Sequence, residues 1–167
     1  MRLCSISLRQ AISSSRTQLV VAVLFASCVL FPSLLSAHCE IPCGIYGDKA
    51  RFLELQEHIR TIEKSIQKIK ELSGKGDSQT INQIVRWVKN KEEHANKIQH
   101  IATQYFMTQR IKPKPPTSPD HKSYLGQLTA AHGILIHAMK CKQNVDQKHV
   151  RNLRIAVKAL AENYFSK

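Results

Sequence analysis

Apolar side chains recur every three and four residues along much of the chain beyond residue 48, and this spacing marks the buried face of an amphipathic helix. The first run predicts a helix over residues 49–73, with Asp48 as a cap at its start and Gly74 and Gly76 after its end. Its expected inward positions are Phe52, Leu55, Ile59, Ile62, Ile66, Ile69 and Leu72.

Three further helical segments follow. The segment 79–111, with Asp77 or Ser78 as its cap, is long enough that we expect it to bend or break, and the prolines of 112–116 then predict an extended connection. Ser118 is expected to start a helix that ends near Cys141, and the last helix is expected to begin at Asn144 or Asp146. The expected inward positions are Ile81, Ile84, Val88, Ala95, Ile98, Ala102 and Tyr105, then Tyr124, Leu128, Ala131, Leu135 and Met139, then Val150, Leu153, Val157, Leu160 and Tyr164.

These segments predict an all-α protein, because no strand pattern is evident between them. Four helices joined by short connections are typical of an antiparallel four-helix bundle, which would occupy residues 48–167. Residues 38–47 show no helical pattern but contain the close metal-binding side chains His38, Cys39 and Cys43, so we expect them to form an N-terminal metal-binding hook in front of the bundle.

The first 37 residues have the character of a secretory leader. They contain three arginines and no acidic residue, and an almost wholly apolar run over 19–35 ends in Ser36 and Ala37. This pattern predicts a signal peptide cleaved after Ala37, and an exported chain, periplasmic or secreted, with no membrane association after cleavage. A retained membrane anchor, a lipoprotein modified at Cys28 and an organelle transit peptide are the alternatives.

Cleavage would leave 22 of the 25 basic residues and all 12 acidic ones, for a net charge of +10. The basic residues are spread over all four helices among glutamates, and aromatic residues are few, so we expect no nucleic-acid partner. The three remaining cysteines, Cys39, Cys43 and Cys141, do not make a disulfide framework. The close pair Cys39 and Cys43 therefore favours metal or redox chemistry, with a disulfide and a structural zinc site as alternatives, and Cys141 is expected to be a buried or unreactive thiol.

The stretch HCEIPCGIY, residues 38–46, offers a concentrated donor set if His38 is the first residue of the mature chain. The α-amine of His38, the amide nitrogen and thiolate of Cys39, and the thiolate of Cys43 make two nitrogen and two sulfur donors, which suit square-planar Ni(II) or Cu(II). The His38 imidazole can reach an axial position. Pro42 and Gly44 allow the tight turn that brings Cys43 back to Cys39.

This stretch resembles the nickel hook of nickel-containing superoxide dismutases, whose pattern is His-Cys-x-x-Pro-Cys-Gly-x-Tyr at the processed N-terminus. The resemblance implies a homohexamer of four-helix bundles with one nickel ion per subunit. It implies conversion of superoxide to O2 and hydrogen peroxide as nickel cycles between Ni(II) and Ni(III). Two alternatives are a non-enzymatic helical module that binds an envelope surface or a polyanion, and a non-enzymatic exported helical protein that binds copper or nickel.

The resemblance also assigns roles to individual residues. His38, Cys39 and Cys43 would bind nickel, Tyr46 would shape a pocket for the small anion beside the metal, and Glu54 would hold the imidazole of His38. The family places an arginine on the second helix behind that glutamate, and here Arg86 and His94 are the two candidates. The other histidines are expected to be ordinary surface or core residues.

Overall fold

The computed structural model describes residue 20 and residues 47–165 of the chain. In residues 47–165 the order of helices is α2 (Asp48–Leu72), α3 (Ser78–His100), the π-helix η1 (Ile101–Arg110), α4 (His121–Gln143) and α5 (Gln147–Phe165). Residues 38–46 of the predicted hook 38–47 lie outside the described residues, and with them His38, Cys39, Cys43 and Tyr46. The predicted leader also lies outside them, except for residue 20. Within the described helices, none combines the length and the apolar character needed to cross a membrane.

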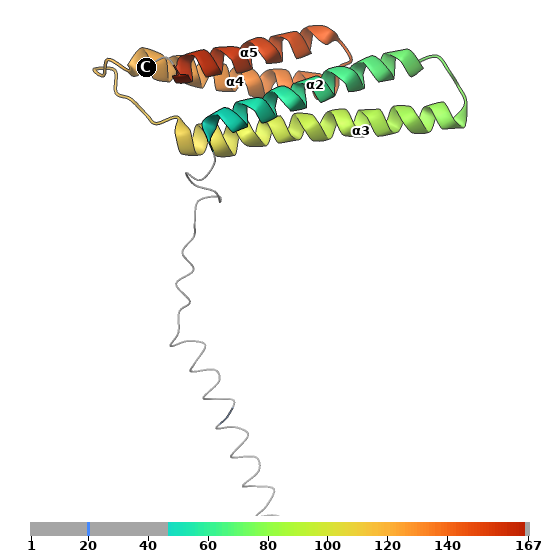
Figure 1. Cartoon of the computed structure of the whole chain (residues 1–167), viewed down its shortest axis with the longest axis horizontal. Helices are drawn as coiled ribbons and strands as arrows, with labels where there is room; N and C mark the ends of the chain where they lie inside the picture. The colour runs from blue at the N-terminus through green and yellow to red at the C-terminus, as the bar shows by residue number, and fades with distance from the viewer. Residues whose placement is uncertain (1–19, 21–46, 166–167) are drawn as a thin grey trace, which may run out of the picture. The chain divides into compact units, whose positions relative to one another are not determined.

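The four α-helices form the antiparallel bundle that the sequence predicts (Figure 1). Contacts join α2 to α3, α3 to α4, α4 to α5 and α5 back to α2, so the helices lie at the corners of a square. The fully buried stripe of α2 consists of Leu55, Ile59, Ile62 and Ile66, and α5 buries Val150, Leu153, Val157 and Leu160 against it. Both helices therefore present the predicted faces to the core.

The start of α2 differs in detail from the prediction. Gly47 occupies the N-cap position, and Asp48 is the first helical residue. The Asp48 carboxylate does not cap its own helix, because it accepts hydrogen bonds from two tyrosines of other elements. At the other end Ser73 is the C-cap, and Gly74 adopts a φ of 93°, which favours glycine.

The long second segment is continuous, but its hydrogen-bonding pattern changes. Asp77 caps α3 by accepting a hydrogen bond from the Thr80 amide at 3.0 Å, as the sequence suggests. From Ile101 the backbone widens into η1, which ends where the Ile111 amide donates to the Phe106 carbonyl at 2.8 Å. The wider turn places the adjacent residues Tyr105 and Phe106 in the core together.

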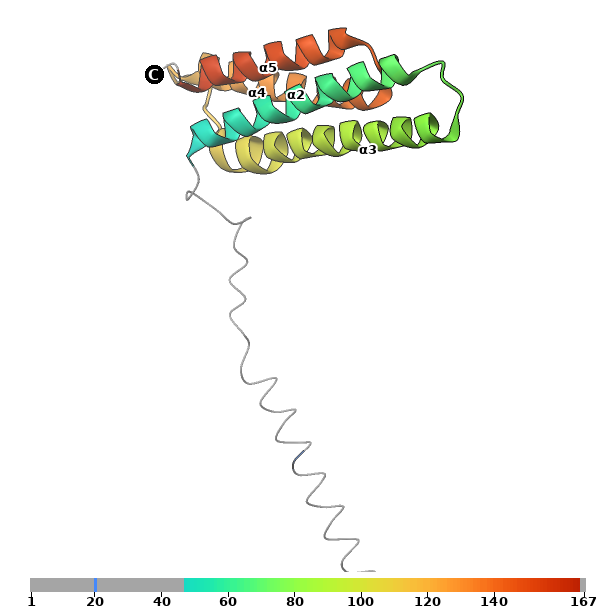
Figure 2. The ribbon, with the colours of Figure 1, turned by 45° about the vertical axis from the view of Figure 1, so that its right-hand side comes forward.

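The first turns of α3 are the clearest error in the predicted core. Ile81 was expected to face inward, yet it is 52% exposed, and Val85 beside it is 61% exposed. In both views the hairpin end of α2 and α3 extends past the connection between α4 and α5 (Figures 1 and 2). There α3 has α2 beside it but neither α4 nor α5, so the apolar spacing at Ile81 does not lead to burial.

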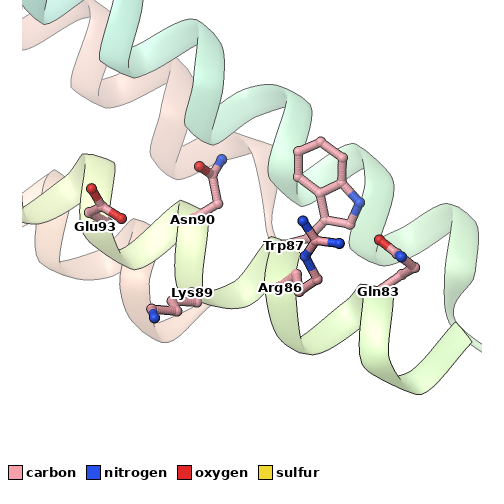
Figure 3. Close-up of a pocket in the computed structure, with 6 residues that line it drawn as sticks. All are labelled: Gln83, Arg86, Trp87, Lys89, Asn90 and Glu93. Atoms are coloured by element: carbon pink, nitrogen blue, oxygen red, sulfur yellow. The ribbon is translucent and has the colours of Figure 1, made fainter. Parts of the chain in front are cut away.

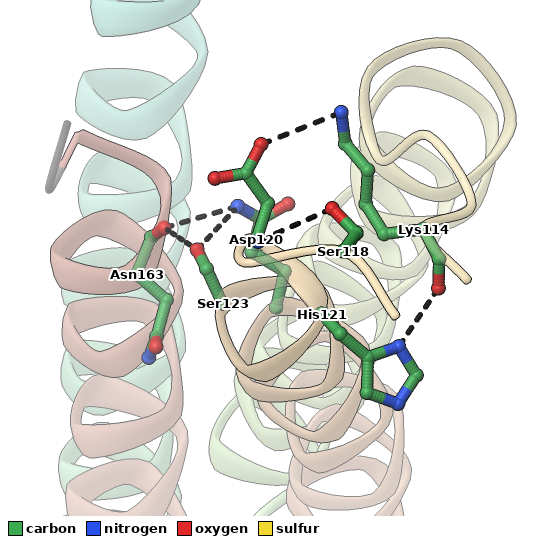
Figure 4. A network of polar contacts seen from close by, with 7 residues as sticks. Lys114, Ser118, Asp120, His121, Ser123 and Asn163 are labelled. Atoms are coloured by element: carbon green, nitrogen blue, oxygen red, sulfur yellow. Dashed lines mark hydrogen bonds and ion pairs between the residues drawn. The ribbon is translucent and has the colours of Figure 1, made fainter. Parts of the chain in front are cut away.

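Helix α4 (His121–Gln143) begins later than predicted. Ser118 and Pro119 form a turn before the helix instead of its first residues, and the Ser118 hydroxyl accepts a hydrogen bond from the Asp120 amide at 3.2 Å (Figure 4). His121 Nδ1 contacts the Lys114 carbonyl at 2.8 Å, which closes this turn. Because the turn uses these groups, α4 starts at His121. Its fully buried residues are small ones together with Ile134, namely Ala131, Ile134, Ala138 and Cys141, whereas Leu128 and Leu135 are partly buried.

A buried lysine binds the carbonyl groups at the C-terminal end of α4. Lys91 of α3 is 3% exposed, and its Nζ donates to the carbonyls of Cys141, Lys142 and Asn144 at 2.7, 2.6 and 3.3 Å. These carbonyls lie at and just beyond the end of α4, where the helix leaves acceptors without intrahelical partners and its dipole is negative. The lysine is thus part of the scaffold and needs no catalytic explanation.

Candidate functional site

Glu54, the one predicted site residue within the described range, lies in the second turn of α2 and is partly exposed. Its Oε2 pairs with Arg51 Nη1 at 2.5 Å, a contact that the three-residue spacing on a helix allows. Its Oε1 lies 3.8 Å from His58 Nε2, which is beyond hydrogen-bonding distance. The carboxylate is therefore held in one orientation by Arg51 and keeps one oxygen for a further donor.

His58 and His94 form a close pair between α2 and α3. The two Nδ1 atoms are 3.0 Å apart, and the rings meet edge to face with centroids 4.9 Å apart. Burial lowers the pKa of His58, and the neighbouring His94 lowers it further. Burial, with help from the charge of Lys97, also lowers the pKa of His94. At neutral pH the pair is neutral, and one ring donates its Nδ1 proton to the other.

This pair separates the two candidates for the residue behind Glu54. His94 reaches the Glu54 region through His58. Arg86 lies about two helical turns before His94 on α3, where it lines a hollow of about 490 Å³ with Gln83, Trp87, Lys89, Asn90 and Glu93 (Figure 3). Of the two candidates, His94 is therefore the one that contacts His58, the histidine beside Glu54.

Arg51 and His58 are neighbours of Glu54 that were not predicted. Helical spacing alone predicts that both lie near Glu54, because residues three or four positions apart share a helix face. His58 had been included among the ordinary histidines, and with 8% exposure it is indeed a core residue. Its position against His94, by contrast, depends on the packing of α2 on α3.

Cys141 is separate from this region. It is fully buried and free, and burial raises the pKa of its thiol to about 11. Such a thiol is protonated at neutral pH and is a poor metal ligand or nucleophile. In residue 20 and residues 47–165 no group of three or more histidine, cysteine or acidic side chains is arranged to hold a metal ion. The proposed ligands His38, Cys39 and Cys43, together with Tyr46, lie outside the described residues.

The histidine pair predicts a loss of stability in mild acid. Both histidines have folded-state pKa values below the ordinary 6.5, so between those values the unfolded chain binds more protons than the folded chain. The free energy of unfolding should therefore fall as the pH drops below about 6.5. His94→Gln, which keeps a hydrogen-bonding group but does not titrate, should reduce this fall by about 1 kcal/mol or less, since His94 is partly exposed.

Urea denaturation at pH 7.5 and pH 5.5 measures this difference. His132→Gln is the matched control, because His132 is an exposed histidine of α4. In His132→Gln the free energy of unfolding should fall between pH 7.5 and pH 5.5 by the same amount as in the unsubstituted protein. An equal difference in the unsubstituted protein and His94→Gln would show that the pair does not titrate on unfolding as described.

Comparison with models of known families matches residues 33–167 to the family described as nickel-containing superoxide dismutase. The matched span contains the stretch HCEIPCGIY and the whole of the bundle. Comparisons with curated proteins and with solved structures gave no match.

Proposed function

Because the chain belongs to the family of nickel-containing superoxide dismutases, we propose that it binds one nickel ion per subunit through His38, Cys39 and Cys43. Membership makes the protein an oxidoreductase with nickel as its cofactor, and it decides against a non-enzymatic metal-binding protein. The observation that carries the ligand proposal is the complete pattern of residues 38–46 within the matched span.

The donor atoms of these residues fit nickel. An amine, a backbone amide nitrogen and two thiolates supply nitrogen and sulfur in the combination that favours square-planar Ni(II). The imidazole of His38 would add a third nitrogen donor. When bound, nickel supplies one-electron exchange between Ni(II) and Ni(III), and the strongly donating thiolates and amide make the higher state accessible.

Glu54 is proposed to orient the imidazole of His38. Metal-bound histidines commonly donate their other N–H to a carboxylate, which fixes the ring. In this structure Arg51 holds Oε2 of Glu54, and Oε1 faces away from that ion pair toward His58. Oε1 is the oxygen that we propose accepts the N–H of His38, with His58 and His94 forming the wall behind it.

The substrate of this family is superoxide, a small anion. We propose that Tyr46 shapes the space in which the anion meets the metal. The net charge of +10 on the proposed mature chain would raise the rate at which an anion arrives, because a positive field attracts it over distances up to the screening length. Two superoxide ions and two protons yield one O2 and one hydrogen peroxide.

Processing and assembly complete the proposal. Cleavage after Ala37 would free the α-amine of His38 and release an exported chain of residues 38–167. We further propose a homohexamer. This is the assembly that the resemblance of residues 38–46 to the nickel hook implies.

Glu54→Ala tests the role of Glu54 at the site. Loss of a carboxylate that orients a metal-bound histidine typically costs about 10- to 100-fold in affinity or activity, so we expect turnover to fall by that amount without vanishing. Dismutation rates per bound nickel measure the effect. Glu71→Ala is the matched control, because Glu71 lies on the same helix and pairs with Lys68 three residues before it, as Glu54 pairs with Arg51. Equal rates in the two variants would contradict the role of Glu54.

A further inference from the structure

The carboxylate of Asp48 joins three elements at one end of the bundle. Its Oδ1 accepts a hydrogen bond from the Tyr105 hydroxyl of η1 at 2.6 Å, and its Oδ2 accepts one from the Tyr164 hydroxyl of α5 at 2.9 Å. Arg110, the last residue of η1, pairs with Oδ1 through Nε at 2.9 Å. We call Asp48, Tyr105, Arg110 and Tyr164 the Asp48 cluster.

Within the Asp48 cluster, Arg110 also contacts Tyr105. Arg110 Nη2 donates to the Tyr105 hydroxyl at 3.0 Å, and the guanidinium lies over the Tyr105 ring at 5.1 Å. The Asp48 and Arg110 side chains are only 27% and 25% exposed, so these charge-assisted hydrogen bonds are partly shielded from water. The cluster is therefore more than a surface ion pair.

The protonation states suit this arrangement. Partial burial alone would raise the pKa of Asp48, but the hydrogen bonds from Tyr105 and Tyr164 and the charge of Arg110 outweigh it and lower the pKa. Burial and the acceptor Asp48 raise the pKa of Tyr164 to about 12. Across the neutral range the cluster thus holds an ionised carboxylate and two protonated phenols.

An aromatic layer beneath fixes the two phenol rings. Phe52 of α2 lies against Phe106 and Tyr164, with ring centroids 4.8 and 5.9 Å apart, and Phe106 meets Tyr105 edge to face at 5.2 Å. Phe106 is fully buried. Because packed rings cannot shift without opening the core, the hydroxyls of Tyr105 and Tyr164 present a rigid receptor for Asp48.

We propose that the Asp48 cluster is a positioning site that fixes where the chain enters the bundle, and so sets the place of the metal-binding residues relative to Glu54. The inference rests on the proposed function. Asp48 follows the ligand Cys43 by five residues, and it shares the rigid helix α2 with Glu54, about 9 Å further along. Asp48, Tyr105 and Tyr164 are thus proposed as positioning residues, which act through the path of the chain and not as ligands.

The test compares the nickel-loaded mature protein with Asp48→Asn, a variant of equal size that loses the charge. The electron paramagnetic resonance spectrum, the turnover per bound nickel and the melting temperature are measured together. We expect Asp48→Asn to retain nickel, to show altered g-values or a broadened nitrogen splitting, and to lose roughly tenfold in turnover. Tyr164→Phe, which keeps the ring and removes one donor, should change the same spectrum less, and it replaces Asp48→Asn if that variant does not fold.

Glu63→Gln is the matched control, because Glu63 and Arg154 also join α2 to α5 through a carboxylate and a guanidinium, at 2.8 Å, but farther along the bundle. It should leave the spectrum and turnover unchanged. If Asp48→Asn or, in its place, Tyr164→Phe lowers the melting temperature while its spectrum and turnover match those of the unsubstituted enzyme, the cluster is only structural and the positioning proposal fails, whereas the proposed function stands. If the unsubstituted enzyme shows no Ni(III) signal, the proposed function itself fails, and the positioning proposal with it.

Discussion

Replacing Cys39 or Cys43 with serine should reduce superoxide dismutation to the level of the nickel-free protein. A serine hydroxyl is a hard ligand that stays protonated near neutral pH, so neither variant can supply the second thiolate that the proposed donor set requires. Without two thiolates the Ni(III) state would be inaccessible even where some nickel binds. Direct decay of superoxide, followed by stopped flow at equal protein concentration alongside the nickel content, measures the loss.

Cys141→Ser is the control for this pair of variants. The buried Cys141 thiol has its pKa raised to about 11, so we do not expect it to bind the metal. The substitution places a hydroxyl in the core and costs about 1–3 kcal/mol of stability, but activity should stay near that of the original. Loss of activity in Cys141→Ser without unfolding would point to a metal site in the bundle and would contradict the assignment to the hook.

Adding one alanine before His38 in the mature chain should abolish activity while the helices remain folded. The addition converts the proposed amine ligand into a backbone amide, and it moves the free amine beyond the imidazole of the same residue. The described bundle begins at Asp48, so its packing should not change. Circular dichroism checks the helices, and the dismutation rate checks the site.

An alanine added after Lys167 is the matched control, because it lengthens the chain by the same residue at the other terminus. It should leave the rate unchanged. The intact mass of the active protein should correspond to a chain that starts at His38. Full activity in a chain that starts upstream of His38 would show that the α-amine is not a ligand.

The helices whose inner faces the sequence predicted correctly are those with continuous aliphatic stripes. In α2 and α5 large side chains repeat every three or four residues, and each stripe has a partner helix along its length. Ile81 has the same spacing but lies where the α2–α3 hairpin extends past the other helices, and it stays exposed. Hydrophobic periodicity identifies a face, whereas burial also depends on the lengths of the neighbouring elements.

The start of α4 depends on hydrogen bonds that compete with the helix, and the widening into η1 is a second feature that the apolar spacing did not predict. Ser118 resembles a helix cap in the sequence, but its hydroxyl and carbonyl are used in a turn that His121 closes against Lys114. The widening at Ile101 has no comparable signal, because the apolar spacing continues through Ala102 and Tyr105. Apolar spacing therefore reveals neither the local hydrogen bonds that delay the start of α4 nor the widening at Ile101.

The proposed metal-binding residues and the Asp48 cluster also differ in whether the sequence alone could predict them. The metal-binding hypothesis came from nine consecutive residues, so a local pattern was sufficient to state it. The Asp48 cluster joins residues that are 57 and 116 positions apart in the chain, and no short motif connects them. Only the packing of α5 and η1 around the start of α2 brings the two tyrosines to one carboxylate.

Electron paramagnetic resonance of the resting mature enzyme tests the central claim most directly, because it reports both the oxidation state of nickel and the atoms bound to it. The spectrum should show a rhombic Ni(III) signal split by one axial nitrogen. His38→Gln keeps the amine and the two thiolates but removes the imidazole, so it should still bind nickel and should lack both the signal and the activity. A His38→Gln enzyme that retains the nitrogen splitting and high activity would contradict the assignment of His38 as the axial ligand.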